Sequence, residues 1–195
     1  MTWDPIIKVL ATMFALSGWF KVYYDHLSNK PKITGRLLVS LIGIGEFEGK
    51  KYSTFIVYPY LVNARKNVVH VLDYELHAKI PSGWRKLISA YGAHRLKDIS
   101  FGTASDEIKI PKFNEDLIYR RKEAVQQGIP LHGWLLFLGD VSLHSTKISS
   151  YRLVCIDANL KRHVIVTKVK HLTNLNLVAQ VADIEFPRSM VRQEK

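Results

Sequence analysis

The chain contains very little cysteine: Cys155 is the single example in 195 residues. One thiol cannot form a disulfide within the chain, so the folded part must be held together by its apolar core. A single, unpaired cysteine also suits a protein of a reducing compartment. Cys155 lies inside a predicted strand, and we expect it to be a buried thiol that packs like a small apolar side chain.

The sequence also lacks the short motifs that carry chemistry. Glycines 43, 45 and 49 fit neither a dinucleotide-binding nor a P-loop pattern, and the eight histidines show no spacing typical of metal ligands. A Gly-x-Ser-x-Gly nucleophile elbow is missing as well. We therefore predict no catalytic residue, no metal site and no cofactor. An enzyme whose site is assembled from residues far apart in the sequence remains the alternative.

Long uncharged stretches are scarce, and the longest near the N-terminus covers residues 9–20. As a helix this stretch measures about 18 Å, which is short for roughly 30 Å of hydrocarbon. Lys8 and Lys21 can extend toward the two lipid interfaces and lengthen the usable span to residues 6–24. We predict a single-pass transmembrane anchor helix over residues 1–29. The alternatives are an interfacial or buried helix and a cleaved signal peptide.

Aromatic and basic residues flank this stretch. Amphipathic rings favour the depth of lipid headgroups, and basic residues favour the cytoplasmic side of a membrane. The C-terminal flank of the apolar stretch carries Lys21, Lys30, Lys32 and Arg36 against Asp25, whereas its N-terminal flank carries Lys8 against Asp4. The positive-inside rule therefore places residues 30–195 in the cytoplasm. The residues predicted to anchor the helix are Trp3, Lys8, Trp19, Phe20, Lys21, Tyr23 and Tyr24.

After Pro31 the apolar pattern changes from helical to strand-like. Residues 72–80 alternate between apolar and polar side chains, which is typical of a strand with one buried face. Residues 54–62 are apolar on both faces, and the polar segment 63–67 predicts a hairpin connection. Further strands are predicted at 33–44, 107–110, 117–120, 133–138, 151–157 and 163–167, with a turn at 157–161.

These short strands, separated by turn residues, predict an antiparallel β-sandwich or barrel for residues 30–195. A parallel sheet would need intervening helices, and residues 32–170 show no convincing helical period. Trp134 and Phe137 follow Gly133 in an apolar strand, so we expect both rings in the core. Residues 171–186 fit a helix and a strand equally well.

The net charge is +11, which favours polyanionic partners. Most basic residues occur as scattered pairs beside predicted turns, as solvated loop charges do. A second interpretation is single-strand nucleic-acid binding, with Tyr52, Tyr58, Tyr60 and Tyr151 as stacking rings. The candidate basic surface comprises Lys50, Lys51, Arg65, Lys66, Arg120, Arg121 and Lys122.

The order of these features resembles uncharacterised prokaryotic proteins that combine an N-terminal membrane-anchor helix, a Lys-Pro-Lys linker and an immunoglobulin-like β-sandwich. The matching stretches are residues 30–32, 57–63, 128–137 and 151–157. The resemblance implies a fold and a membrane location, and it brings no catalytic residues. We expect a non-enzymatic, membrane-tethered interaction or scaffold module that binds lipid through its helix and a protein partner of unknown identity. Nucleic acid is the less favoured partner.

Overall fold

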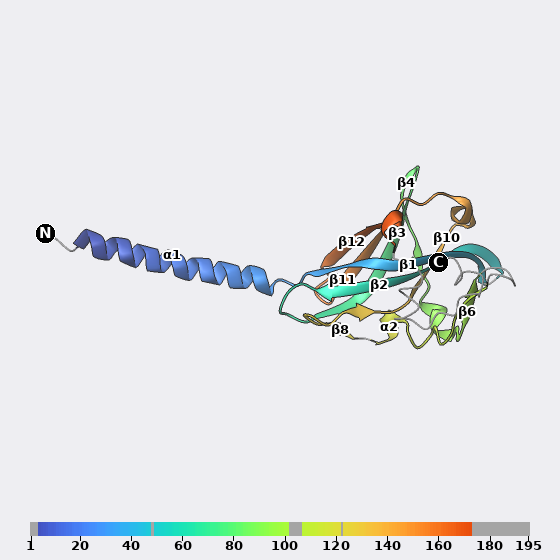
Figure 1. Ribbon diagram of the computed structural model, residues 1–195, viewed down its shortest axis with the longest axis horizontal. Coiled ribbons are helices and arrows are strands. Elements are labelled where there is room, and N and C mark those ends of the chain that lie inside the picture. Colours follow the sequence, from blue (N-terminus) through green and yellow to red (C-terminus); the bar gives the residue numbers. More distant parts are fainter. Residues whose placement is uncertain (1–3, 48, 102–106, 122, 173–195) are drawn as a thin grey trace, which may run out of the picture.

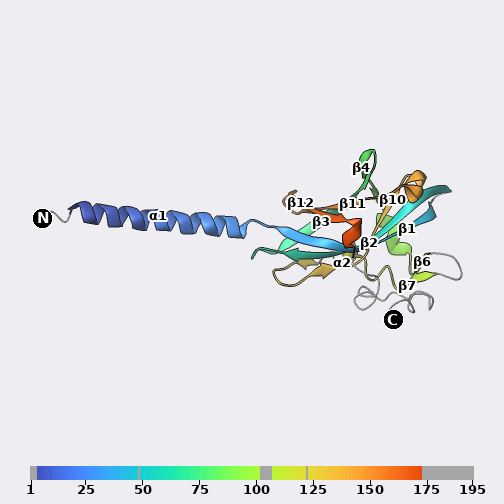
Figure 2. The same ribbon diagram turned by 45° about the horizontal axis from the view of Figure 1, so that its top comes forward.

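A computed structural model describes residues 4–47, 49–101, 107–121 and 123–172, and it consists of one long helix followed by a β-sheet domain (Figure 1). The helix α1 (Asp4–Asn29) extends away from the sheets in both views (Figures 1 and 2). Lys30 to Lys32 connect it to the first strand. The helix ends shortly before Pro31, as expected, because the residue before a proline disfavours helical geometry.

The domain contains two antiparallel sheets. The first has the strand order β1 (Ile33–Phe47), β2 (Lys50–Asn63), β10 (Leu135–Gly139) and β5 (Ile88–Ser89), and β9 (Leu131–His132) also pairs with β2. The second has the order β12 (Arg162–Lys168), β11 (Ser150–Asp157), β3 (Val69–Ile80) and β4 (Gly83–Lys86), and β8 (Ala124–Val125) also pairs with β3. A separate hairpin joins β6 (Ile99–Phe101) to β7 (Ile108–Ile110). The antiparallel β prediction is therefore confirmed.

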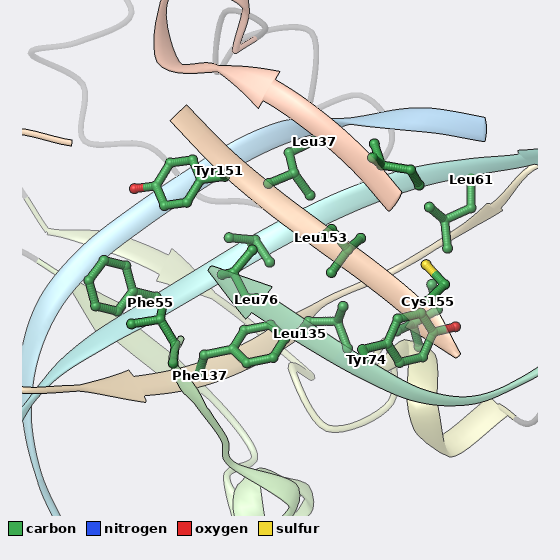
Figure 3. Close-up of a cluster of buried hydrophobic side chains, with 14 of the residues drawn as sticks. Leu37, Phe55, Leu61, Tyr74, Leu76, Leu135, Phe137, Tyr151, Leu153 and Cys155 are labelled. Carbon is green, nitrogen blue, oxygen red and sulfur yellow. The ribbon is translucent and has the colours of Figure 1, made fainter. Parts of the chain in front are cut away.

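Apolar side chains fill two cores, one on each face of the first sheet. Successive side chains of a strand point to opposite faces. Phe55 and Val57 of β2 accordingly join the core between the two sheets, whereas Ile56 and Tyr58 join a second core on the outer face. Figure 3 shows the first core, where labelled side chains from strands of both sheets point toward one another. This arrangement explains why residues 54–62 are apolar on both faces.

The two sheets meet along β1 and β12, where side chains make the connection. The backbone N–H of Ile33 donates to Nδ1 of His163 at 3.2 Å, and the N–H of Leu37 donates to Oγ1 of Thr167 at 3.0 Å. All four residues are buried. Because a buried N–H without a partner is costly, these bonds stabilise the contact between the sheets. We call this contact the β1–β12 seam.

Three local predictions are wrong. Residues 63–67 do not form a hairpin, because β2 and β3 belong to different sheets. Residues 117–120 were expected to form a strand, but most of them lie in the short helix α2 (Ile118–Arg121). Leu72 is 62% exposed although its alternation predicts burial. The pairing of β3 with β11 shifts register between Asp73 and Val71, so Leu72 lies at a bulge that turns it outward.

No helix among the described residues is long and apolar enough to cross a membrane. The transmembrane span predicted over residues 1–29 is therefore not supported, since Ser17, Gly18, Lys21 and Asp25 interrupt the apolar sequence of α1. Most of the tail whose structure the sequence left open, residues 173–186, lies outside the described residues, as does Trp3.

Candidate functional site

The described part of α1 presents apolar side chains to solvent. At 100° per residue, Met13, Leu16, Phe20 and Tyr23 recur every three or four positions and share one side of the helix. Gly18 and Asp25 lie on the opposite side by the same spacing. Large apolar side chains of α1 with exposed fractions between 53% and 76% are Met13, Phe14, Leu16, Trp19, Phe20, Val22, Tyr23 and Tyr24.

A basic pocket lies where α1 joins the domain. Its volume is about 320 Å³, and its charged lining residues are all cationic: Lys30, Lys32, Arg65, Lys161 and Arg162. Pro31, Ile33, His163 and Val164 complete the lining, and no carboxylate takes part. We call this site the junction pocket. It is formed by three segments: the linker after α1, the connection between β2 and β3, and the turn between β11 and β12.

Hydrogen bonds between these segments hold the junction pocket in shape. Lys161 donates from Nζ to the carbonyl oxygen of Pro31 at 2.7 Å. The N–H of Ala64 donates to the carbonyl of Lys32 at 2.9 Å, and the side-chain amide of Asn67 donates to the carbonyl of Asn29 at 2.8 Å. The linker is thus tied to both neighbouring turns, so its lysines are positioned by the fold.

Asp157 and His163 form a buried pair at the pocket, and His163 is the member that lines it. Oδ2 of Asp157 lies 2.8 Å from Nε2 of His163, and the two side chains are 2% and 3% exposed. Because Nδ1 of His163 accepts a hydrogen bond from the N–H of Ile33, Nε2 carries the proton and donates a hydrogen bond to Oδ2 of Asp157. The other oxygen, Oδ1, accepts the N–H groups of Asn159 and Lys161, both at 2.9 Å. Both ring nitrogens are occupied, so this pair is a structural lock for the turn and for the start of β1.

These contacts also set the charge state of the pair. Burial by itself raises the pKa of Asp157, but the hydrogen bonds from His163 and from the N–H groups of Lys161 and Asn159 outweigh it and lower that pKa below its ordinary value. Asp157 is therefore a carboxylate at neutral pH. Its charge is directed toward the turn and His163, and it does not line the pocket.

Glu75 is the other carboxylate near the pocket cations. It bonds Lys86 at 2.7 Å and Arg162 on its second oxygen. The bond from Lys86 lowers the pKa of Glu75; burial acts in the opposite direction, and the bond from Arg162 adds to the lowering. Glu75 thus neutralises part of the charge of Arg162. Lys30, Lys32 and Arg65 form no ion pair with any residue that the structure describes.

The basic residues predicted from the sequence do not form one surface. Lys50 and Lys51 begin β2, whereas Arg65 and Lys66 follow its end, roughly 40 Å away at the usual rise of a strand. Arg120 lies on α2, where Nη1 donates to the carbonyl of Asn114 at 3.1 Å. The side chain of Arg121 and all of Lys122 lie outside the described residues, as does the side chain of Lys8. Of the predicted set, only Arg65 lines the junction pocket.

Two of the four rings proposed for base stacking are buried, and Tyr52 and Tyr60 are half-buried. Tyr58 and Tyr151 are each 1% exposed, and the hydroxyl of Tyr58 lies 2.7 Å from Nδ1 of His132. Tyr60 is half-buried and stacks on the same histidine ring. Their place in β2 and β11, beside the cores, explains the burial. Tyr58 and Tyr151 therefore cannot stack on nucleotide bases in this fold.

The expected character of Cys155 is confirmed. It is fully buried in β11, and burial raises the pKa of its thiol to about 12. Within the described ranges, no group of three or more histidine, cysteine, aspartate or glutamate side chains is arranged to hold a metal ion.

Sequence reasoning did not single out Lys30, Lys32, Lys161 and Arg162 as one site. The pocket residues are up to 134 positions apart (from Lys30 to Val164), and the β1–β12 seam brings the turn between β11 and β12 to the linker. The available signals were the basic pairs Arg65-Lys66 and Lys161-Arg162 beside predicted turns and the two lysines that follow the predicted helix. In comparisons with protein-family models, curated proteins and solved structures, none matched this chain.

Proposed function

We propose that this protein is a non-enzymatic interaction module whose β-sandwich is attached to a membrane surface by α1. The observation that carries the proposal is the exposed apolar surface of α1. Isolated helices are marginally stable in water, and exposed apolar surface costs about 25 cal/mol per Å². Such a helix needs a partner that covers its exposed apolar side chains. A lipid interface suits it, because Trp19, Tyr23 and Tyr24 combine apolar rings with polar groups that favour headgroup depth.

The charge of the chain favours lipid over a second copy of the same helix. Each copy carries a net charge of +11, so two copies repel one another, whereas an anionic leaflet attracts the chain. Anionic lipids are concentrated in the cytoplasmic leaflet. Lys30, Lys32 and Arg36 directly follow α1. We therefore place the domain on the cytoplasmic side of the membrane.

We also propose that the domain is an immunoglobulin-like sandwich. Such folds have a sheet with the strand order A-B-E-D and a second sheet with G-F-C, extended by C′ in the variable type. In chain order, β1, β2, β3, β4, β5, β10, β11 and β12 correspond to A, B, C, C′, D, E, F and G. The two sheets then read A-B-E-D and G-F-C-C′, which supports the assignment. The disulfide between strands B and F of antibody domains is missing because Cys155 is the only cysteine.

Vesicle flotation tests the attachment. The full-length chain is mixed with phosphatidylcholine vesicles, and the bound fraction is measured after centrifugation. We expect the chain to float with the vesicles. Phe20→Asp places a charge on the apolar side of α1 and should abolish most of the binding.

Gly18→Asp is the matched control, because it adds the same charge about 160° around α1 from Phe20. It should leave most of the binding intact. A wild-type chain that stays with the unbound protein contradicts the proposal. Equal losses in the two variants contradict the assignment of the lipid-binding side.

A further inference from the structure

We propose that the junction pocket binds a phosphate group carried by an anion, with the headgroup of an anionic lipid as its source. This inference rests on the proposed attachment of α1 to a membrane, which brings lipid headgroups to the pocket. Residue 30 follows the last residue of α1, so the pocket lies directly beside the helix that we place at the lipid surface.

The chemistry of the lining selects an anion. Five of its nine lining residues are lysine or arginine, and none is acidic. The nearby carboxylates are engaged elsewhere: Asp157 with His163 and the β11–β12 turn, and Glu75 with Lys86 and Arg162. Lys30, Lys32 and Arg65 thus keep their donors for a ligand. Phosphate fits such a set, because arginine and lysine form charge-assisted hydrogen bonds with its several oxygens.

The pocket is also arranged in advance of binding. Its cations come from three separate segments that hydrogen bonds join through Pro31, Lys32 and Asn29. A free helix end carries partial negative charge on its last carbonyls, which would weaken anion binding. The side-chain amide of Asn67 donates a hydrogen bond to one of these carbonyls, that of Asn29. The volume of about 320 Å³ lies at the lower end of the range for small-ligand pockets, which suits a headgroup.

Arg65 and Lys66 give a matched pair for the test. They are neighbours in the same connection, and either glutamine substitution removes one positive charge, but only Arg65 lines the pocket. Binding of the full-length chain is measured on vesicles of phosphatidylcholine alone and of phosphatidylcholine with phosphatidylglycerol. We expect stronger binding to the mixed vesicles. Arg65→Gln should lower that binding about tenfold or more, as loss of a charge-assisted bond does, and Lys66→Gln about fivefold at most.

A soluble anion distinguishes the source of the phosphate. The full-length chain in detergent is titrated with pyrophosphate and, separately, with single-stranded RNA. Pyrophosphate binding that Arg65→Gln weakens, without any gain on mixed vesicles, assigns the pocket to a soluble phosphate. Equal losses for Arg65→Gln and Lys66→Gln in every assay, including RNA binding, mean nonspecific attraction between charges and overturn the inference.

The two proposals can fail separately. Binding to phosphatidylcholine that does not increase with phosphatidylglycerol, together with no pyrophosphate binding, removes the phosphate site and leaves the attachment through α1. Binding of pyrophosphate through Arg65 by a chain that does not float with phosphatidylcholine removes the attachment and leaves the site.

Discussion

Trp134 packs in the outer core of the first sheet. Its ring lies 4.7 Å from that of Tyr58 and 6.3 Å from that of Phe113, measured between centroids. The side chain is 1% exposed, which confirms its expected place in a core. We expect Trp134→Ala to lower the free energy of unfolding by about 3–5 kcal/mol, because it removes a large buried ring and leaves a cavity. Chemical denaturation monitors this change.

Trp84→Ala is the control for this substitution. Trp84 is half-buried, and its ring faces the guanidinium of Arg152 at 4.2 Å on the surface. Its removal should cost about 1 kcal/mol, the range of a surface cation–π contact. Similar losses for the two tryptophans would contradict the burial of Trp134.

Asp157 makes the stability of the domain sensitive to acid. Its pKa is lowered in the folded state, so it adds stability above the ordinary aspartate pKa of about 3.9. That contribution is lost as the pH falls from this value through the lower folded pKa. We expect Asp157→Asn to reduce the free energy of unfolding at neutral pH by roughly 1.5–3 kcal/mol, the range for hydrogen bonds to charged groups. Chemical denaturation of both proteins at several pH values measures this difference in the free energy of unfolding.

In the same series, the difference between wild type and Asp157→Asn should shrink below pH about 4, because the carboxyl of the unfolded wild-type chain becomes protonated there while the folded protein still holds it ionised. Asp140→Asn serves as the comparison, since Asp140 is exposed and its carboxylate accepts hydrogen bonds from the N–H and the hydroxyl of Ser142. Asp140→Asn should change the free energy of unfolding less than Asp157→Asn does. A constant difference between wild type and Asp157→Asn down to strongly acidic pH would show that the carboxylate charge contributes nothing.

Among the elements, the β1–β12 seam depends on side-chain bonds to two backbone N–H groups. Thr167→Val keeps the shape of the side chain but removes the acceptor for the N–H of Leu37. Because that N–H is buried, its loss should cost about 1–3 kcal/mol of unfolding free energy. Val166→Thr, the reverse exchange at an exposed neighbour on the same strand, should stay within about 0.5 kcal/mol. Equal effects on thermal unfolding would mean that the seam bond does not stabilise the domain.

The sequence predicts the long strands well, because their patterns extend over many residues. Ile33–Phe47, Lys50–Asn63, Ser150–Asp157 and Arg162–Lys168 were expected within a few residues of their observed bounds. Strands of two to four residues, such as β5, β8 and β9, are too short to show a period. The segment 117–120 was misread because tertiary bonds decide its conformation: the N–H of Ile118 donates to the carbonyl of Trp134.

The candidate site was much harder to predict than the fold. Periodicity reports which face of a strand is buried, but it does not report which turns meet at one end of a sandwich. Lys32 and Lys161 come together only because the seam places the start of β1 beside the start of β12. The net charge of the chain can be counted from the sequence. Which basic residues gather at the end of α1 can be seen only once the strand topology is known.

At the scale of the whole molecule, α1 continues into the longest strand of the domain. Figure 1 shows the helix and β1 following one another along the long axis of the molecule. Residues from Ile33 to Phe47 pair with β2 over nearly their entire length. Mechanical tension applied through α1 therefore enters the domain along the direction of β1. The ladder bonds between β1 and β2 are then sheared together instead of being opened one after another, and a pull on the helix is resisted by the full length of the sheet.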